Sequence, residues 1–331
     1  MSRLKRTTLI HFTSQVLVSV SGFLATFAIA RLLGSDVLGK YALVAALVIW
    51  FSFPVAAVGS ATTKRMSEGD RPGAFLGAGV LAVAVLVPVL VGVVLLGRSF
   101  FRGYIGAPVV GLLAAVIAAT AVFKLVKNGL NGQKKVAVSG LSIAAHRVFR
   151  TILQVALILA GFRLGGIIAG HVAGLLLATV VALSFYDVTP ALPGREELRS
   201  LLEYARYSWL GTLQTQSFGW MDTLVLGFFV TASQIGIYEV AWNLASVLIL
   251  VGVSVRTTLF PEISDLGTED RYGEIHEFVG DGLLFTGVFA IPGLVGAAVV
   301  GPRVLAIYRP ATNRARTKIA RIAAPRLNAG R

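Results

Sequence analysis

Two arginines stand close together inside an otherwise apolar stretch of the sequence. Arg147 and Arg150 fall within residues 136–161, and their three-residue spacing places both side chains on one face of an α-helix. Moving an ion out of water costs on the order of 20 kcal/mol in the idealised limit, so guanidinium groups there need a cavity or an anionic partner. The pair is a candidate site for an anionic ligand. Pairing with a carboxylate, for which Asp222 is the candidate, is the alternative.

Other polar side chains lie inside apolar stretches or at their ends. Lys124 and Lys127 are expected at the inner end of one stretch, and Arg31 closes the first stretch at the outer side. Each of these could attract an anionic headgroup or simply anchor a helix end. His146, although adjacent to Arg147, is expected to point elsewhere. Four glutamines could bond to ligand hydroxyls or join helices to one another: Gln15, Gln154, Gln214 and Gln216.

The patterns that enzymes and metal sites need are missing from this sequence. It contains no cysteine, which excludes thiol chemistry and CxxC metal sites. No GxSxG, P-loop, HExxH or EF-hand pattern occurs, and the acidic segment 256–281 is expected to be a solvated loop. We therefore predict a protein that is not an enzyme and has no catalytic residue, metal site or cofactor.

The elements that carry these residues are predicted to be membrane-spanning helices. The chain is 56% hydrophobic and 14% charged, with a mean hydropathy of +0.79, which is too apolar for one aqueous core. A span needs about 20 apolar residues. Pro54, Pro88 and Pro292 are expected to kink the spans that contain them. Nine spans are predicted, at about 7–33, 41–63, 74–97, 105–126, 136–161, 164–186, 205–230, 236–258 and 282–302.

The positive charges predict how the helices are oriented. A net charge of +14 can indicate a protein that binds nucleic acid. Here the positive-inside topology of a membrane protein accounts for most of the charge, so no nucleic-acid partner is expected. With the N-terminus inside, fifteen Lys and Arg fall in cytoplasmic segments and six outside. The first apolar run is too long for a cleaved signal peptide. We predict a multi-pass protein of a prokaryotic cell membrane with a cytoplasmic N-terminus.

An internal repeat relates the two halves of the chain. Residues 38–41 (LGKY) follow the first span and residues 235–238 (IGIY) follow the seventh, an offset of 197. Because six spans separate them, both copies enter the membrane in the same direction, which is a parallel repeat like those of transporters whose halves rock about a central site.

The repeat predicts a division into two lobes. Helices 1–6 form an N-lobe over 1–186, a cytoplasmic loop covers 187–204, and helices 7–9 form a partial C-lobe over 205–308. A six-span unit implies about twelve spans, so the second lobe is expected to be incomplete. Residues 309–331 are rich in Arg, Ala and Pro, and we interpret them as a truncated or out-of-frame ending; a basic arm that binds anionic lipid is the alternative.

Several short motifs resemble one membrane protein family. They are ARLLG at 30–34, LGKY at 38–41, residues 59–64, MDTLVLG at 221–227 and the turn at 235–238. Together with the span count they resemble polysaccharide biosynthesis proteins, the lipid-linked oligosaccharide flippases of the multidrug/oligosaccharidyl-lipid/polysaccharide exporter superfamily, over about residues 7–308. The resemblance implies an all-α, MATE-like fold of two lobes, with Arg31 in a family-like segment and Asp222 on the seventh helix.

The resemblance also implies a function. A flippase moves a sugar and its phosphate across the membrane by alternating access, and the deep arginines fit this anionic cargo. Its partners would be a lipid-linked oligosaccharide, membrane lipids and glycan-assembly proteins. Three alternatives stay open: a cation-coupled multidrug exporter of the same superfamily, a non-functional fragment, and a membrane glycosyltransferase or polymerase.

Overall fold

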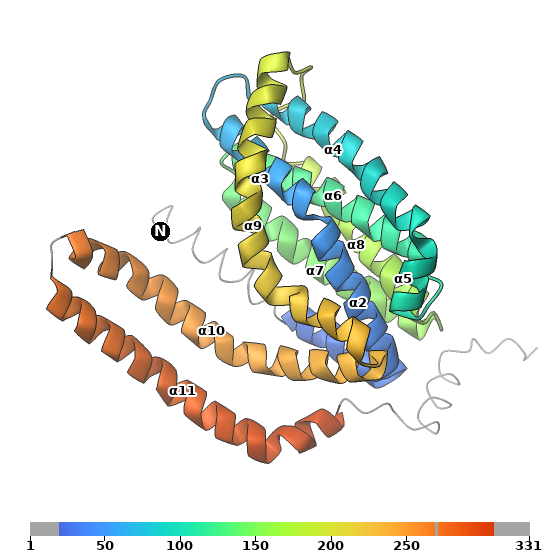
Figure 1. Cartoon of the computed structure of the whole chain (residues 1–331), viewed down its shortest axis with the longest axis vertical. Helices are drawn as coiled ribbons and strands as arrows, with labels where there is room; N and C mark the ends of the chain where they lie inside the picture. Colours follow the sequence, from blue (N-terminus) through green and yellow to red (C-terminus); the bar gives the residue numbers. More distant parts are fainter. Residues whose placement is uncertain (1–19, 269–270, 308–331) are drawn as a thin grey trace, which may run out of the picture. The chain divides into compact units, whose positions relative to one another are not determined.

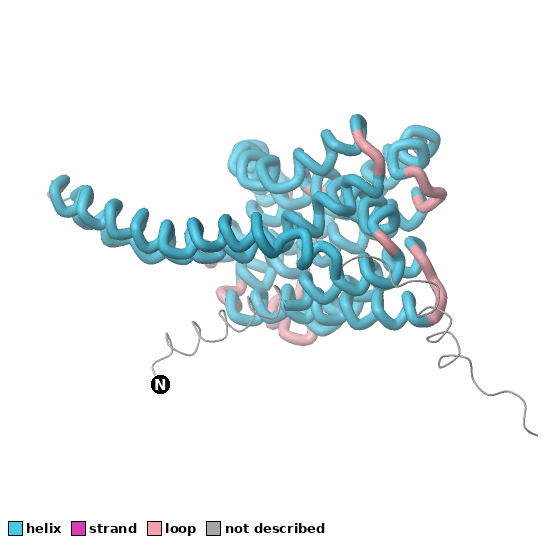
Figure 2. Tube along the Cα trace, turned by 90° about the horizontal axis from the view of Figure 1, so that it is seen from below, coloured by secondary structure: helices cyan, strands magenta, loops and turns pink. Residues whose placement is uncertain are grey.

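The computed structural model describes residues 20–268 and 271–307, and this part of the chain is helical with short connections and no strand (Figures 1 and 2). The first described helix is Val20–Leu33. The others are α2 (Ser35–Phe51), α3 (Phe53–Ser67), α4 (Pro72–Leu96), α5 (Arg98–Ile105), α6 (Val110–Gly132), α7 (Val136–Leu159), α8 (Leu164–Leu183), α9 (Arg195–Phe229), α10 (Ala232–Thr268) and α11 (Tyr272–Ile307). The predicted all-α class is confirmed.

Five of the described helices are long and apolar enough to cross a membrane: α4, α6, α7, α8 and the segment Tyr272–Gly296 of α11. The pair α2 and α3 passes the same test as one span bent by 48°. The bend falls at Ser52, just before Pro54 in the first turn of α3, because proline lacks the N–H that a continuous helix needs. The predicted kink at Pro54 is confirmed, whereas the kinks at Pro88 and Pro292 and the total of nine spans stay predictions.

The last three helices extend beyond the predicted spans. The expected cytoplasmic loop 187–204 gives way to helix at Arg195, where the Gly194 N–H donates to Glu197 Oε2 at 2.7 Å and caps α9. The prediction of a loop over 256–281 is wrong in the same way, since α10 continues to Thr268 and α11 begins at Tyr272. Hydropathy indicates where a helix leaves the hydrocarbon core of the membrane. The helix itself can continue into water, because its backbone hydrogen bonds are made within the helix, so its ends lie beyond the apolar run.

The described residues form two compact units, one up to Gly236 and one from Ile237 onward. In the first unit, α3, α4, α6 and α9 share an apolar core. Its buried members are Val55, Ala57, Val58, Ala61, Ala78, Val83, Ala121, Leu125, Leu201 and Ala205. Half of these side chains are alanine, which lets helix backbones approach closely in a bundle that lipid surrounds.

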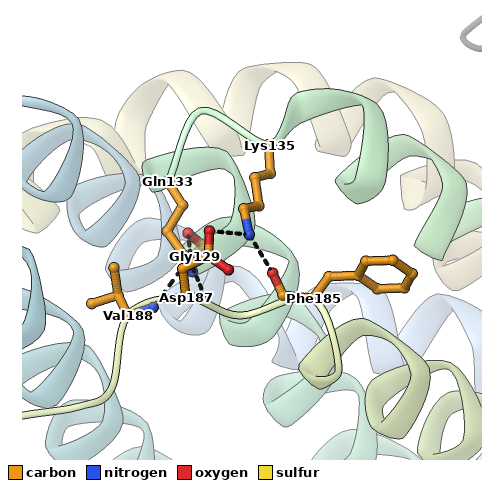
Figure 3. A network of polar contacts seen from close by, with 6 residues as sticks. All are labelled: Gly129, Gln133, Lys135, Phe185, Asp187 and Val188. Carbon is orange, nitrogen blue, oxygen red and sulfur yellow. Dashed lines mark hydrogen bonds and ion pairs between the residues drawn. The ribbon is translucent and has the colours of Figure 1, made fainter.

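The loops at one end of the bundle are tied together by polar contacts (Figure 3). Lys135 Nζ, just before α7, pairs with Asp187 at 2.5 Å and donates to the Phe185 carbonyl at 2.6 Å. Gln133 Oε1 accepts from the Asp187 N–H at 2.9 Å. Farther along the same connection, the Ala191 N–H donates to the Gly73 carbonyl at 2.8 Å. The segment between α8 and α9 is therefore fixed against α4 and the α6–α7 turn.

Candidate functional site

A buried polar cluster lies where α2, α7 and α8 meet. The Gln154 amide of α7 donates to the Tyr41 hydroxyl of α2 at 2.9 Å and to the Ile167 carbonyl of α8 at 3.0 Å. The Tyr41 hydroxyl also lies 3.1 Å from His171 Nδ1. The three helices are thus joined by side chains that are 1–9% exposed.

Glycines bring α8 close to α7 at this level. A Cβ on Gly170 would lie 2.9 Å from the Gln154 nitrogen, and one on Gly174 would lie 2.7 Å from Arg150 Cα. Since real Cβ atoms almost never come that close, the spacing of four residues between these glycines is what permits the contact. The backbone of α7 is therefore held against α8 at the positions that carry the polar side chains.

The two arginines lie in the middle of α7, as predicted. Counted from Val136 at 1.5 Å per residue, Arg147 and Arg150 lie about 16 and 21 Å along the helix. Arg147 is half-buried, and Arg150 is 9% exposed. Neither forms an ion pair with a carboxylate of the described residues. Their position in the middle of the helix is confirmed, whereas their depth in the membrane and their role in binding stay predictions.

Three polar atoms on one face of α7 have no hydrogen-bond partner in the described part of the chain. They are His146 Nε2, Arg150 Nε and Gln154 Oε1, from residues spaced four apart. A buried polar atom without a partner costs about 1–3 kcal/mol. This face therefore retains hydrogen-bonding capacity that a bound polar group would use.

The expectation that His146 points elsewhere is wrong. His146 is buried, and its ring stacks on that of His171 with centroids 5.5 Å apart. The Phe123 ring of α6 also packs against the His146 ring, with centroids 5.3 Å apart. His146 precedes Arg150 by four residues, so helical geometry puts the two on the same face, and the sequence argument considered only its neighbour Arg147.

Lys124 does not lie at a helix end. Because α6 continues to Gly132, Lys124 is about 12 Å inside the helix, and Lys127 about 8 Å. Both are half-buried. Lys124 Nζ donates to the Ser52 hydroxyl at 2.6 Å, where α2 breaks from α3. The lysine thus supports the bend of that span, and a role for either lysine in gathering headgroups stays a prediction.

The remaining predicted residues are not brought to this cluster by any described contact. Arg31 is exposed near the end of Val20–Leu33. Asp222 on α9 accepts a hydrogen bond from the Thr223 N–H at 2.8 Å, and its pairing with the arginines stays a prediction. Gln15 and the side chains of Gln214 and Gln216 lie outside the described residues.

Sequence reasoning did not single out Tyr41 or His171 as site residues. Tyr41 ends the LGKY motif, but only the packing of α2 on α7 and α8 gives its hydroxyl a partner. Glu239, a carboxylate on α10 that is 8% exposed, was also not predicted from the sequence. The sequence does indicate Glu239 as a candidate, because Glu239 lies within the predicted span 236–258 and acids inside membrane spans are rare.

The repeated connections contact each other. In both, a helix ends, one or two residues follow, and a new helix begins, at Ser35 in one and Ala232 in the other. A Cβ on Gly39 would overlap the Ala232 carbonyl, and one on Gly236 would overlap the Ser35 carbonyl. Ser35 and Ser233 share a hydrogen bond of 2.7 Å between their hydroxyls. Gly39 and Gly236 are equivalent positions of the repeat, as are Ser35 and Ala232. Each glycine contacts the first helical residue of the other copy.

The chain belongs to the polysaccharide biosynthesis protein family, whose model matches residues 73–308. It is 33% identical to a probable flippase, AglR, of Haloferax volcanii over 318 residues, which is 95% of this chain and 66% of that protein. It is 24% identical to a probable low-salt glycan biosynthesis flippase, Agl15, of the same organism over 309 residues, 92% of this chain and 65% of that protein. The chain thus spans just under two thirds of the length of these relatives.

Solved structures show the same fold. The lipid II flippase MurJ in an inward closed conformation matches with a TM-score of 0.73 at 15% identity, over 94% of this chain and 70% of that one. An inward-facing MATE family transporter of the MOP superfamily matches with a TM-score of 0.65 at 14% identity, over 91% and 75%. The predicted MATE-like membrane fold is therefore confirmed.

Proposed function

We propose that this protein is a flippase that moves a lipid-linked oligosaccharide across the cell membrane of a prokaryote, with its N-terminus in the cytoplasm. The observation that carries the proposal is Arg150, a guanidinium buried in the middle of a span with an unpartnered Nε and no described carboxylate beside it. A phosphate or diphosphate headgroup supplies the negative charge and the acceptor oxygens that this arginine and Arg147 need. Both related flippases of Haloferax volcanii support this assignment.

The polar cluster supplies complementary contacts for the rest of the headgroup. His146 Nε2 and Gln154 Oε1 lie on the same face of α7 and would bond to sugar or phosphate groups that reach it. No bond is made or broken in the cargo, so the protein acts as a transporter rather than an enzyme, and it would receive its substrate from glycan-assembly proteins.

Translocation proceeds by alternating access. The reciprocal contact of Gly39 and Gly236 closes the end of the bundle where both repeats begin their second helix, the outer end in the proposed orientation. Releasing cargo there requires these helix starts to separate. The lipid tail remains in the bilayer while the headgroup passes the arginines.

A complementation experiment tests the function. The full chain, expressed in a strain that lacks its own oligosaccharide flippase, should restore glycan export, and the double variant Arg147→Gln/Arg150→Gln should abolish it at an unchanged protein level. The matched control is Arg163→Gln, which removes an exposed arginine just before α8 and should leave export intact. Lack of export by the parent chain, or normal export by the double variant, contradicts the proposal.

A further inference from the structure

A cationic pocket lies between α5 and the start of α6, in a part of the chain separate from the α7 cluster. It is open to the surface and has a volume of about 760 Å³. Its lining residues come from α5, from the connection that follows it and from the first turn of α6: Arg98, Ser99, Arg102, Gly103, Pro108, Val110 and Gly111. All of them belong to the first compact unit.

The pocket concentrates positive charge without a counter-ion. Arg98 and Arg102 are four residues apart on α5, so their guanidinium groups lie on the same helix face, and both are exposed. Neither forms an ion pair with a described carboxylate, and the first turns of α5 and α6 contain no acid. Two adjacent guanidinium groups held in one pocket favour a ligand with several anionic oxygens.

The start of α6 adds hydrogen-bond donors to the same pocket. Val110 and Gly111 are the first two residues of this 23-residue helix, whose N-cap, Val109, provides no side-chain acceptor. The first-turn N–H groups of a helix have no intrahelical partner and carry partial positive charge. Nothing lies within 4 Å of where a Cβ on Gly111 would be, so a ligand can reach the backbone there.

The level of α5 indicates where the ligand comes from. α5 begins two residues after the membrane-spanning α4 ends, and α6 begins five residues after α5 ends. The apolar side of α5 faces the protein, since Phe101 and Ile105 are buried. The Phe101 ring packs against the Phe51 ring with centroids 5.8 Å apart. A short amphipathic helix between two spans lies at the membrane surface, where lipid phosphates are found.

The side chains beside the pocket suit lipid chains. Leu95 and Leu96, at the end of α4, are 47% and 89% exposed. In water such exposure would be costly, whereas next to acyl or isoprenyl chains it is favourable. Exposed apolar side chains therefore lie two and three residues before the first of the two arginines.

We propose that this pocket binds the phosphate of a membrane lipid in the leaflet where α4 ends, which is the outer leaflet in the orientation proposed above. Arg98 and Arg102 bind the phosphate oxygens, Ser99 and the first N–H groups of α6 donate to the same group, and the lipid chains lie along Leu95 and Leu96. The site is separate from the arginines of α7 and does not depend on what the protein transports.

The test measures lipid binding to the purified full chain in detergent by native mass spectrometry. The probes are phosphatidylglycerol, phosphatidylcholine and inorganic phosphate. All proteins carry Arg147→Gln/Arg150→Gln, so that binding at α7 does not contribute. We expect phosphatidylglycerol to bind more tightly than the other two probes, and Arg98→Gln/Arg102→Gln to weaken it about tenfold or more, the usual consequence of losing charge-assisted hydrogen bonds.

Two further variants complete the design. Arg163→Gln removes another exposed arginine and should leave binding unchanged, whereas Arg98→Lys/Arg102→Lys should keep part of the affinity because it retains charge without the planar fork. An unchanged affinity in Arg98→Gln/Arg102→Gln, or an equal loss in Arg163→Gln, overturns the site. Inorganic phosphate binding as tightly as phosphatidylglycerol overturns the assignment to a lipid. None of these outcomes bears on transport.

Discussion

The molecule carries two pairs of arginines whose surroundings differ sharply. Arg147 and Arg150 lie in the middle of α7 among buried polar side chains, whereas Arg98 and Arg102 are exposed on the short helix α5 between two spans. Neither pair meets a described carboxylate. The two pairs have the same chemistry but differ in burial, and in the proposed membrane arrangement they also differ in depth.

Depth decides what each pair can do. A guanidinium at the membrane surface keeps contact with water, so a phosphate there competes with solvent and binds modestly. A guanidinium in the middle of a span has lost its hydration, so a phosphate that reaches it replaces a missing partner. We therefore assign the deep pair to the moving cargo and the shallow pair to resident lipid.

The largest difference between the pairs should appear in transport. In proteoliposomes, Arg147→Gln/Arg150→Gln should lower the rate of translocation of a diphosphate-linked isoprenyl sugar by about 100-fold or more, the effect of losing two strong charge-assisted contacts. Arg98→Gln/Arg102→Gln should keep at least about half the rate. Equal losses in both variants would remove the distinction between the pairs.

A covalent link across the repeats should also stop transport. Since the sequence contains no cysteine, Ser35→Cys/Ser233→Cys introduces only one pair, at positions whose hydroxyls are 2.7 Å apart. Oxidation should abolish translocation, because the deep arginines then stay closed off from this end, and reduction should restore it. Gel mobility and transport are measured on the same samples.

The control for the link is Asp36→Cys/Ser233→Cys, which shifts one thiol by a residue and should cross-link less. Full transport by the oxidised Ser35→Cys/Ser233→Cys protein would show that this contact does not open during the cycle.

Packing around the deep pair should be sensitive to one methyl group. Gly174→Ala places a Cβ 2.7 Å from Arg150 Cα, and overpacking of this kind destabilises by about 1–3 kcal/mol. Gly92→Ala in α4, where nothing lies within 4 Å, should be neutral or slightly stabilising. Thermal unfolding in detergent compares the two, and equal melting temperatures would argue against close contact of α7 and α8 at Arg150.

The smallest effect is expected for the stability of the shallow pair. Arg98→Gln/Arg102→Gln changes exposed side chains without described partners, so the free energy of unfolding should move by less than about 0.5 kcal/mol. The same thermal assay measures it. A larger loss would mean that these arginines hold α5 in place rather than bind lipid.

The sequence predicted the features that hydropathy and helical spacing encode. The bounds of α4, α7 and α8 fall within three residues of the predicted spans, because the apolar run and the helix end together there. The position of Arg147 and Arg150 in the middle of α7 followed from their distance to Val136. The repeat led correctly to two equivalent connections, since both copies kept a glycine where the backbones approach.

Features that depend on packing between helices were missed. The partners of Tyr41, Gln154 and His171 come from α2, α7 and α8, and no local pattern reports which faces meet. His146 was misplaced by considering its neighbour rather than the residue four positions on. Lys124 was misplaced because hydropathy fell before the helix ended.

The most direct test of the proposed function is the binding of an isoprenyl diphosphate to the full chain in which Arg98→Gln/Arg102→Gln has already removed the shallow pair. Isothermal titration compares this protein with the same protein carrying Arg147→Gln/Arg150→Gln in addition. We predict that the first binds the diphosphate at one site and that the second loses at least about 100-fold in affinity. Equal affinity in the two proteins would contradict the assignment of the α7 arginines to an anionic headgroup.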